Sequence, residues 1–531
     1  EYALVDETGK HDLAELRSFQ DWYLRYWLES VPGVAEVASV GGFVKQYQVK
    51  IDPNKLIAYG VPINGVIEAV RKSNNDVGGR VVEFAATEYF VRGRGYIMSV
   101  EDIENIPVGA NGNGTPVFIR DIADVTLGPD MRRGLAELDG KGETVGGIVV
   151  MRYGENALEV IKEVKKKIEE IKPSLPEGVE IVTTYDRSGL IERAIGTLKE
   201  TLFEEMVIVS IVIIVFLLHL RSALIPILTI PIAVLMAFIP IYYMNLTSNI
   251  MSLGGIAIAI GAMVDASIVI IENVHKKLER WQSEGEKGSR SDIMVDAMKE
   301  VGRPIFFSLL VITVSFLPVF ALEYQEGRLF KPLAFTKTFS MFFASILAIT
   351  ITPALAAIFI RGKVKPEENN PLSRFLIKIY EPVVDFVLRF KKTLIISSII
   401  ILIITIFPFL KLGSEFMPPL NEGTILYMPT AVTGMSITEA GRILQIQDKM
   451  LMKFPEVERV FGKIGRSDSP TDPAPLSMVE TVITLKPENE WREGMTWDKL
   501  VAEMNRSMKF PGMANIFWMP IQTRTEMLTS G

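Results

Sequence analysis

The chain has 531 residues, nearly half of them apolar, and a formal net charge of −7. The negative charge and the lack of a basic stripe or an aromatic platform argue against nucleic acid as a partner. Cysteine is absent, which excludes disulfides, a thiolate metal site and a redox motif. The chain begins at Glu1 with neither an initiator Met nor a signal peptide, so we expect a fragment of a longer protein.

Residues 1–200 are mixed in polarity and are predicted to fold in water as an α+β segment. The amphipathic stretch Leu13–Ser30 leads into "VPGVAEVASVGG" (Val31–Gly42) and then into the strand-like alternation "YQVKID" (Tyr47–Asp52). A second helix is predicted for "PINGVIEAVRKSN" (Pro62–Asn74), opened by Pro-Ile-Asn. This order of elements is typical of a small helix-and-strand domain.

Apolar residues gather in six runs within residues 201–411, which we predict to be a transmembrane helix bundle. The runs are roughly 15 to 22 residues long, close to the ~20 that a helix needs to cross the hydrocarbon of a bilayer. The polar stretch Asp186–Glu205 is predicted to be a helix that continues into the first span. The predicted spans are Met206–Leu220, Ala223–Tyr243, Met251–Ile271, Ile305–Leu322, Phe339–Ile360 and Leu394–Leu410.

The distribution of Lys and Arg predicts the topology, since these residues mark the cytoplasmic side of short loops. The connections after the third and fifth runs are rich in Lys and Arg, whereas the opposite connections are poorer. Residues 1–200 and 412–531 are therefore predicted to share the extracytoplasmic face. Because all six runs fit one alternation of charge, the alternative that some of them are buried core helices is less favoured.

The last segment, 412–531, repeats the pattern of the first. We therefore predict duplicated α+β subdomains on one face of the membrane. The counterparts are the amphipathic stretch Ile437–Lys453, the segment "FPEVERVFGKIGR" (Phe454–Arg466), the strand "VETVITL" (Val479–Leu485) and a second helix, Thr496–Met508, with Thr496 as its N-cap.

The third run contains a carboxylate, Asp265, amid apolar residues in the stretch "GAMVDASIVIIENVH" (Gly261–His275). An ionised group at the bilayer centre costs about 3 kcal/mol, so Asp265 is expected to face the bundle interior, where it can take a proton from one side and release it to the other. The alternative is a fixed ion pair that only holds helices together. Glu272 lies two turns on along the same face and could pass protons, or it could cap the charge of Lys276.

Together these segments resemble the resistance-nodulation-division (RND) transporters, and within them the copper and silver pumps of the heavy-metal efflux branch. The resemblance covers essentially the whole chain. Besides Gly261–Glu279, it rests on "YALVDETGKHDLAELRSFQDW" (Tyr2–Trp22), "VASVGGFVKQYQVKIDP" (Val37–Pro53), "NEGTILYMP" (Asn421–Pro429), "DPAPLSMVET" (Asp472–Thr481) and "EMLTSG" (Glu526–Gly531).

The resemblance implies an inner-membrane, multi-pass protein about twice this length, with twelve spans in two repeated halves. The six spans here would be the second to the seventh, and the soluble segments would be periplasmic porter subdomains. Such pumps work as homotrimers joined to a periplasmic adaptor (a membrane fusion protein) and an outer-membrane channel. They take proton-motive force through an acidic residue at the position of Asp265. Drug exporters have two adjacent Asp residues there, but Ala266 follows here. The family's Lys partner would lie in the missing half, so this chain alone should not pump.

Methionine is the candidate metal ligand. A thioether is soft and uncharged, and it suits Cu(I) and Ag(I) rather than Zn(II), Co(II) or Ni(II). Most of the 23 methionines are expected to be packing residues. Three stand apart by context, and the resemblance implies that they are the metal ligands of a periplasmic cleft, with three sulfurs around a bare monovalent ion: Met428, Met478 and Met527.

Three further methionines, Met251, Met263 and Met341, match positions of a proposed relay that would accept metal from the cytoplasmic side. The relay is incomplete, since Ile270 and Ala356 stand where the family has another Met pair. Packing is the alternative for each of the three.

The sequence therefore predicts a proton/cation antiporter that exports Cu(I) or Ag(I), with no cofactor, rather than an enzyme. One alternative is a pump for divalent metals or organic compounds. The divalent branch tends to carry Asp-Phe-Gly where this chain reads Ala259-Ile260-Gly261, which disfavours it. The other alternative is a non-transporting receptor or assembly protein. The three histidines, His11, His219 and His275, are too scattered to suggest a zinc site, and each is predicted to be a surface or interfacial residue.

Overall fold

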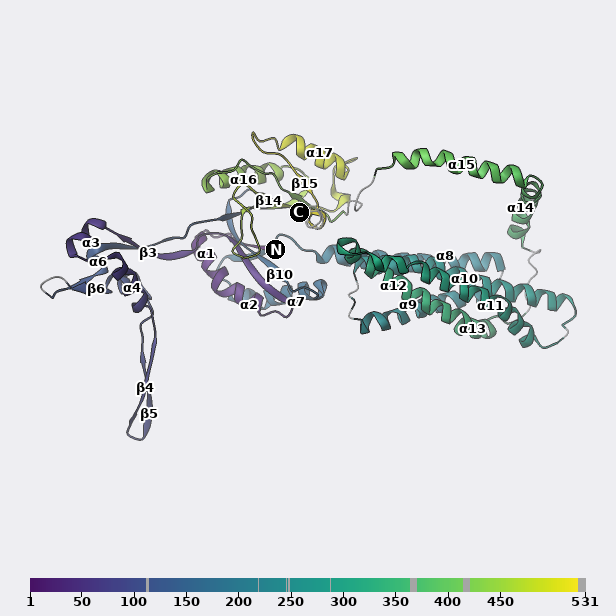
Figure 1. Ribbon diagram of the computed structural model, residues 1–531, viewed down its shortest axis with the longest axis horizontal. Coiled ribbons are helices and arrows are strands. Elements are labelled where there is room, and N and C mark those ends of the chain that lie inside the picture. The colour runs from purple at the N-terminus through teal and green to yellow at the C-terminus, as the bar shows by residue number, and fades with distance from the viewer. Residues whose placement is uncertain are drawn as a thin grey trace. The chain divides into compact units, whose positions relative to one another are not determined.

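The computed structural model describes residues 1–110, 114–217, 219–244, 246, 249–286, 288–362, 370–413 and 421–523 (Figure 1). They belong to two compact units. The sheet unit comprises Glu1–Asp186 and Asn421–Arg524, and the helical unit comprises Arg187–Leu420 and Thr525–Gly531. Each unit is described by itself below.

The sheet unit is built on one nine-stranded sheet with the order β11-β1-β10-β9-β13-β14-β12-β15, in which β2 also pairs with β10. All of the pairings are antiparallel. The strands are β1 (Tyr2–Asp6), β2 (Val34–Gly41), β9 (Gly134–Leu138), β10 (Glu143–Met151), β11 (Val179–Thr183), β12 (Thr424–Tyr427), β13 (Val457–Gly465), β14 (Val479–Leu485) and β15 (Phe517–Trp518).

The sheet contains the same strand order twice, β2-β10-β1-β11 and β13-β14-β12-β15. Each copy follows the order strand, helix, strand, strand, helix, strand that is typical of a split βαβ unit. In the first copy a continuous helix (α1, Leu13–Phe19; η1, Gln20–Leu24; α2, Arg25–Glu29) and α7 (Ala157–Ile171) supply the helices. In the second copy these are α16 (Ile437–Leu451) and α17 (Trp497–Ser507).

This arrangement corrects part of the predicted repeat. The counterparts of β14 and α17 are β10 and α7, not the strand at Tyr47–Asp52 and the helix at Pro62–Asn74. A long insertion separates β2 from β10. The strand β3 and the helix α4 inside it have local patterns similar to those of β14 and α17, which explains the wrong prediction. Thr496 does occupy the N-cap position of α17, but its side chain makes no capping hydrogen bond.

The insertion has a small apolar core of its own, which includes Val66, Ile103, Ile119 and Val125. Within it β3 pairs with β8, β4 with β5 and β6 with β7. Its elements are β3 (Lys45–Ile51), α3 (Pro53–Tyr59), α4 (Ile63–Ser73), β4 (Val77–Phe84), β5 (Thr87–Gly93), α5 (Val100–Glu104), β6 (Pro107–Ala110), β7 (Pro116–Phe118), α6 (Ile119–Ile122) and β8 (Ala123–Pro129).

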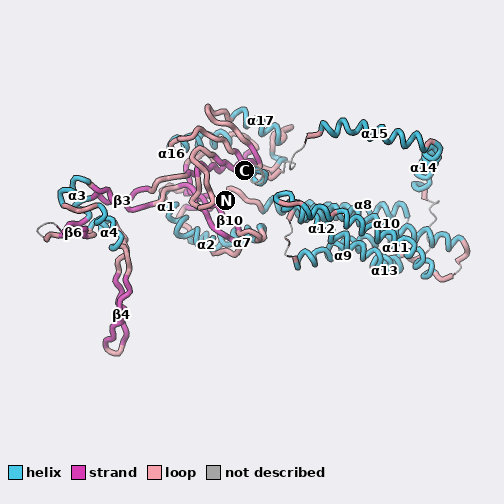
Figure 2. Tube along the Cα trace, in the orientation of Figure 1, coloured by secondary structure: helices cyan, strands magenta, loops and turns pink. Residues whose placement is uncertain are grey.

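The helical unit has helices and no strands among its described residues (Figure 2). Its α-helices are α8 (Ser188–Leu217), α9 (Leu224–Tyr243), α10 (Ile250–Ser283), α11 (Arg290–Ser315), α12 (Tyr324–Ile349), α13 (Ile351–Phe359), α14 (Pro371–Arg389) and α15 (Lys391–Lys411). Among the described residues, five stretches are long and apolar enough to cross a membrane: Arg221–Tyr243, Ile250–Ser283, Arg290–Ala321, Glu326–Ile349 and Lys391–Lys411.

Two of the predicted spans differ from these stretches. The first run lies in the second part of α8, where Glu204 and Glu205 precede it, and it is not among the five. The fifth run, Phe339–Ile360, is divided at Thr350 between α12 and α13. Pro353 has no N–H for the carbonyl of Ile349, and its ring crowds that carbonyl, which favours a break in the helix at this point. Hydropathy does not detect this break because the apolar composition continues across it.

Helices α10 and α12 approach each other closely at Gly255. A Cβ atom at Gly255 would lie 2.2 Å from Thr336 Oγ1 and 2.4 Å from the carbonyl oxygen of Leu333. We expect Gly255→Ala to force the helices apart and to destabilise the bundle by about 1–3 kcal/mol. The adjacent Gly254 has open space at its Cβ position, so Gly254→Ala is the matched control and should be neutral. Denaturant unfolding of both variants in detergent would check this, and equal stabilities would contradict it.

Candidate functional site

Two of the three predicted cleft methionines lie on neighbouring strands of the sheet unit. Strand β12 pairs with β14 so that Tyr427 is opposite Thr481, and the pairing continues to Thr430 opposite Met478. This register places Met428 diagonally across from Met478 on the same face of the sheet, since side chains alternate between faces. Diagonal neighbours are within reach of long side chains, so the two thioethers can share one ligand.

The sheet face that carries these methionines is opposite the face covered by helices. Tyr427 and Ile483 point into a core that also contains Leu500 and Met504 of α17. Met428 is 9 % exposed and Met478 is half-buried, on the other face. The backbone N–H of Met428 donates to the carbonyl of Ile516 at 2.9 Å, which fixes its strand from the second side. Met527, the third predicted ligand, lies outside the described residues.

A buried lysine, Lys463, lies close to this face. Lys463 Nζ lies 2.6 Å from Asp472 and 2.7 Å from Glu480, and Glu480 is opposite Lys463 in the ladder of β13 and β14. Burial lowers the pKa of Lys463, but the charge of Glu480 and the hydrogen bond to Asp472 outweigh it and leave this pKa raised. Burial likewise raises the pKa of Asp472, but hydrogen bonds from Lys463 and Ser467 leave it lowered. The acids near the methionines therefore already have a cation.

Replacing Lys463 with Met should destabilise the sheet unit by about 3 kcal/mol at neutral pH, because two partly buried carboxylates lose their cation. The lowered pKa of Asp472 contributes stability above the unfolded pKa, and that contribution is lost as the pH falls through the folded value. The loss caused by the substitution should therefore shrink in acid. Denaturant unfolding across a pH series would measure it. The exposed Lys453→Met is the control, expected to stay within about 0.5 kcal/mol of wild type. A pH-independent loss would contradict the prediction.

In the helical unit, the predicted proton-coupling residue Asp265 lies on α10. Asp265 is exposed rather than directed into the described bundle. Its stripe on α10 includes the exposed side chains of Ile258 and Val269, whereas Met263 and Ile270 on the other side of the helix are buried. Asp265 therefore lies on a different side of α10 from the residues that pack against neighbouring described helices. Both sides of α10 are apolar, so the sequence alone does not show which side a neighbouring helix covers.

Glu272 forms an ion pair with Lys276, with 2.5 Å between Oε1 and Nζ. Of the two predicted roles, the structure therefore shows the charge cap. Both side chains are roughly half exposed, so the pair stabilises the helix by about 0.3–0.5 kcal/mol.

The three membrane methionines have unequal surroundings. Met263 and Met341 are buried in one apolar cluster shared by α10 and α12, whereas Met251, near the start of α10, is only partly buried. Ile270 and Ala356, at the positions where the family has another Met pair, are buried among apolar side chains. Apolar packing therefore accounts for Met263 and Met341 without a metal.

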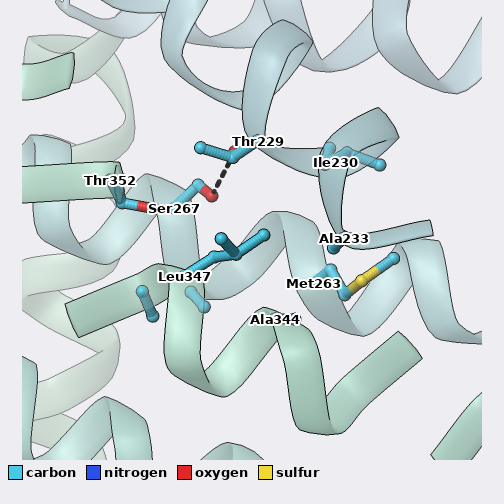
Figure 3. A pocket seen from close by; sticks show the side chains of 10 residues that line it. Thr229, Ile230, Ala233, Met263, Ser267, Ala344, Leu347 and Thr352 are labelled. Atoms are coloured by element: carbon cyan, nitrogen blue, oxygen red, sulfur yellow. Dashed lines mark hydrogen bonds between the residues drawn. The ribbon is translucent and has the colours of Figure 1, made fainter. Parts of the chain in front are cut away.

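A small cavity of about 10 Å³ opens beside Met263, between α9, α10, α12 and α13 (Figure 3). Thr229 Oγ1 and Ser267 Oγ lie 3.3 Å apart at its edge. This volume is about the minimum for one water molecule, and the two hydroxyls would give it partners. Its lining is Thr229, Ile230, Ala233, Met263, Ala266, Ser267, Ala344, Leu347, Ala348 and Thr352.

One cluster of polar side chains in the helical unit was not predicted from the sequence. His275, predicted to be a surface or interfacial residue, is 4 % exposed, and its Nε2 lies 2.8 Å from Ser222 Oγ. The same oxygen lies 2.7 Å from His219 Nδ1, and the two imidazole rings are 5.2 Å apart. No local sequence signal links these residues, because they meet only through the packing of α10 against the turn at Leu220–Ala223.

The whole chain, residues 1–531, matches the AcrB/AcrD/AcrF family. It is 52% identical over its full length to the cation efflux system protein CusA of Escherichia coli K12, of which it covers 51%. It is 37% identical, over 97% of its length, to the cobalt-zinc-cadmium resistance protein CzcA of Cupriavidus metallidurans, of which it covers 49%.

A crystal structure of a heavy metal efflux pump matches 99% of the chain with a TM-score of 0.82 and 31% identity, and half of that pump is covered. The chain thus spans about half the length of the curated relatives it matches. The resemblance to RND transporters drawn from the sequence motifs is confirmed, and the chain belongs to the AcrB/AcrD/AcrF family.

Proposed function

We propose that the protein containing this chain is an inner-membrane efflux transporter that uses proton-motive force to export Cu(I) and Ag(I). It would work as a homotrimer that passes the metal through a periplasmic adaptor to an outer-membrane channel. The observation that carries this proposal is the placement of Met428 and Met478 on one face of neighbouring strands. The higher identity to CusA than to the cobalt-zinc-cadmium resistance protein supports the same assignment.

The choice of metal follows from the chemistry of the two side chains. Thioethers bind soft monovalent ions and compete poorly for Zn(II), Co(II) or Ni(II), which favour imidazole or carboxylate. The carboxylates near the site, Asp472 and Glu480, are held by Lys463 and so do not offer a free hard ligand. Met527 would complete a neutral three-sulfur site that discriminates against divalent ions.

Proton coupling is assigned to Asp265. A carboxylate on an apolar face of a membrane helix costs about 3 kcal/mol if it meets lipid. We therefore propose that the half of the protein not spanned by this chain covers this face of α10 and brings a cation to Asp265. This would also explain why the described bundle leaves Asp265 exposed. Metal would enter the methionine site from the periplasm, and the membrane methionines need not conduct it.

The test is the metal specificity of the full-length protein. Its gene would be expressed with the adaptor and the channel in a host stripped of metal pumps, and growth would be scored in silver, copper and zinc. Resistance to silver and copper without resistance to zinc is the expected result. Zinc resistance would replace the proposal with a divalent-metal pump. Purified protein in liposomes should also show a proton flux that depends on added Ag(I), and a receptor or assembly protein would show none.

A further inference from the structure

Two carboxyl groups meet in the interior of the sheet unit, far in sequence from each other. Glu137 on β9 is 2 % exposed, and Asp448 on α16 is fully buried. The carboxyl of Asp448 rests on Gly462 of β13, and Gly462 is opposite Glu137 in the ladder of β9 and β13, so the two carboxyl groups are close neighbours. Thr481 Oγ1 lies 3.4 Å from Asp448 Oδ1, while no hydrogen-bond donor among the described residues reaches the buried Oδ2.

Such a contact requires a proton, because two ionised carboxylates offer only acceptors. Both carboxylate oxygens of Glu137 already accept a backbone hydrogen bond. Its Oε2 accepts the N–H of Gly140 at 3.0 Å and its Oε1 accepts the N–H of Gly142 at 2.9 Å. Asp448 lacks such donors and therefore holds the proton and donates it to Glu137. Burial, followed by the hydrogen bond and charge of Glu137, raises the pKa of Asp448.

The charged groups around the pair do not supply a cation to it. Asp139 adds negative charge, and Arg459 pairs with Asp139 at 3.8 Å. Glu143 lies opposite Glu137 in the ladder of β9 and β10, and its cation is Arg132 at 2.5 Å. On α16 itself, Lys449 follows Asp448, while Arg442 is paired with Glu439. Losing the shared proton would therefore place a second, uncompensated negative charge in the interior.

The backbone is built to bring the two acids together. A Cβ atom at Gly462 of β13 would lie 2.2 Å from Asp448 Oδ2, so only glycine lets this carboxyl rest on the strand. A Cβ atom at Gly140 would lie 2.8 Å from Lys449 Cα, so the turn between β9 and β10 packs directly on α16. Strand β9 in turn pairs with β10 of the first repeat and with β13 of the second.

We propose that Glu137 and Asp448 form a proton-binding site in the sheet unit, whose single shared proton fastens α16 to the turn between β9 and β10. This site lies outside the membrane bundle and does not rest on the proposed transport function. Because Asp448 holds its proton more tightly in the folded state, the stabilisation is fully present below its unfolded pKa and is lost as the pH rises through its folded value. Acid tightens this junction between the repeats, and alkali loosens it.

Infrared spectroscopy of the full-length protein in detergent tests whether the proton is there. Wild type at neutral pH should show the carbonyl stretch of a protonated carboxylic acid from this pair. Asp448→Asn should remove that signal, whereas Glu137→Gln should shift its frequency because the acceptor of the proton changes. The control is Glu456→Gln, since Glu456 is equally buried but is paired with Arg492 at 2.5 Å and should be ionised. Its spectrum should keep the signal. A wild type without the signal, or a signal that survives Asp448→Asn, would overturn the proposal.

Hydrogen exchange tests whether the proton fastens the helix. After correction for the intrinsic effect of pH, amide protection in α16 should fall with rising pH in wild type. It should stay level in Asp448→Asn, whose amide still donates to Glu137 but cannot ionise. If this variant does not fold, Glu137→Gln removes the negative charge that opposes ionisation of Asp448 and should weaken the pH dependence. A wild-type pH dependence in the variant that folds would refute the fastening role.

Discussion

Replacing Asp265 with Asn in the full-length protein will reduce metal export to the background of a host without the pump. Asn keeps the size and polarity of the side chain but cannot take up and release a proton, so coupling to proton-motive force is lost. Expression, membrane insertion and trimer formation should be unchanged. The measurement is silver efflux from loaded liposomes or cells under an imposed proton gradient.

The control for Asp265 is Asp296→Asn on α11, which removes an exposed carboxylate of the same helical unit from a polar stretch. This variant should export silver normally. Export at the wild-type level by the Asp265 variant would mean that its carboxylate only holds helices together or plays no part, and another group would have to couple the proton.

Replacing Met478 with Leu will abolish resistance to silver and copper while the protein remains folded. Leu has nearly the volume of Met, so packing on a half-buried strand end costs less than about 1.5 kcal/mol. The thioether, however, is gone, and a site of soft ligands loses one of its members. Met428→Leu should have the same effect, since the register of β12 and β14 places both side chains on one face.

The matched control is Met504→Leu. Met504 is fully buried in the core between the sheet and α17, on the opposite face from the candidate site. The same chemical change there should leave resistance intact. If cells with Met478→Leu keep their resistance to silver and copper, the thioether of Met478 is not required and the three-sulfur site is wrong. A loss of resistance with Met504→Leu would show that packing of Met504 matters instead. Binding of Ag(I) to the purified variants by calorimetry would separate a loss of affinity from a loss of transport.

Local patterns in the sequence predicted the elements well. The helices at Pro62–Asn74, Ile437–Lys453 and Thr496–Met508 and the strand at Val479–Leu485 are present with nearly the predicted bounds. Each of these has a clear period of apolar residues and a recognisable start or stop. Such signals depend on neighbours within a few residues, which a single sequence contains.

The relations between distant elements could not be predicted in this way. The register that brings Met428 beside Met478 is set by the pairing of whole strands, and the meeting of Glu137 with Asp448 depends on α16 packing across β9. The orientation of Asp265 depends on which face of α10 is covered. The repeat was misaligned because the insertion after β2 has helices and strands of its own. The periodicity of apolar residues also gave no role for the methionines. Their candidate roles came from the resemblance of the sequence motifs to those of RND transporters.

The shared strand β9 has a consequence for biosynthesis. Its partner β13 lies beyond helices α8 to α15 in sequence, so β9 leaves the ribosome long before β13 exists. At ordinary synthesis rates the interval is on the order of tens of seconds. During that time the first repeat would carry an open strand edge that can pair with the wrong chain. A chaperone that shields strand edges should therefore raise the yield of the folded protein, most of all when translation of the helices is slowed.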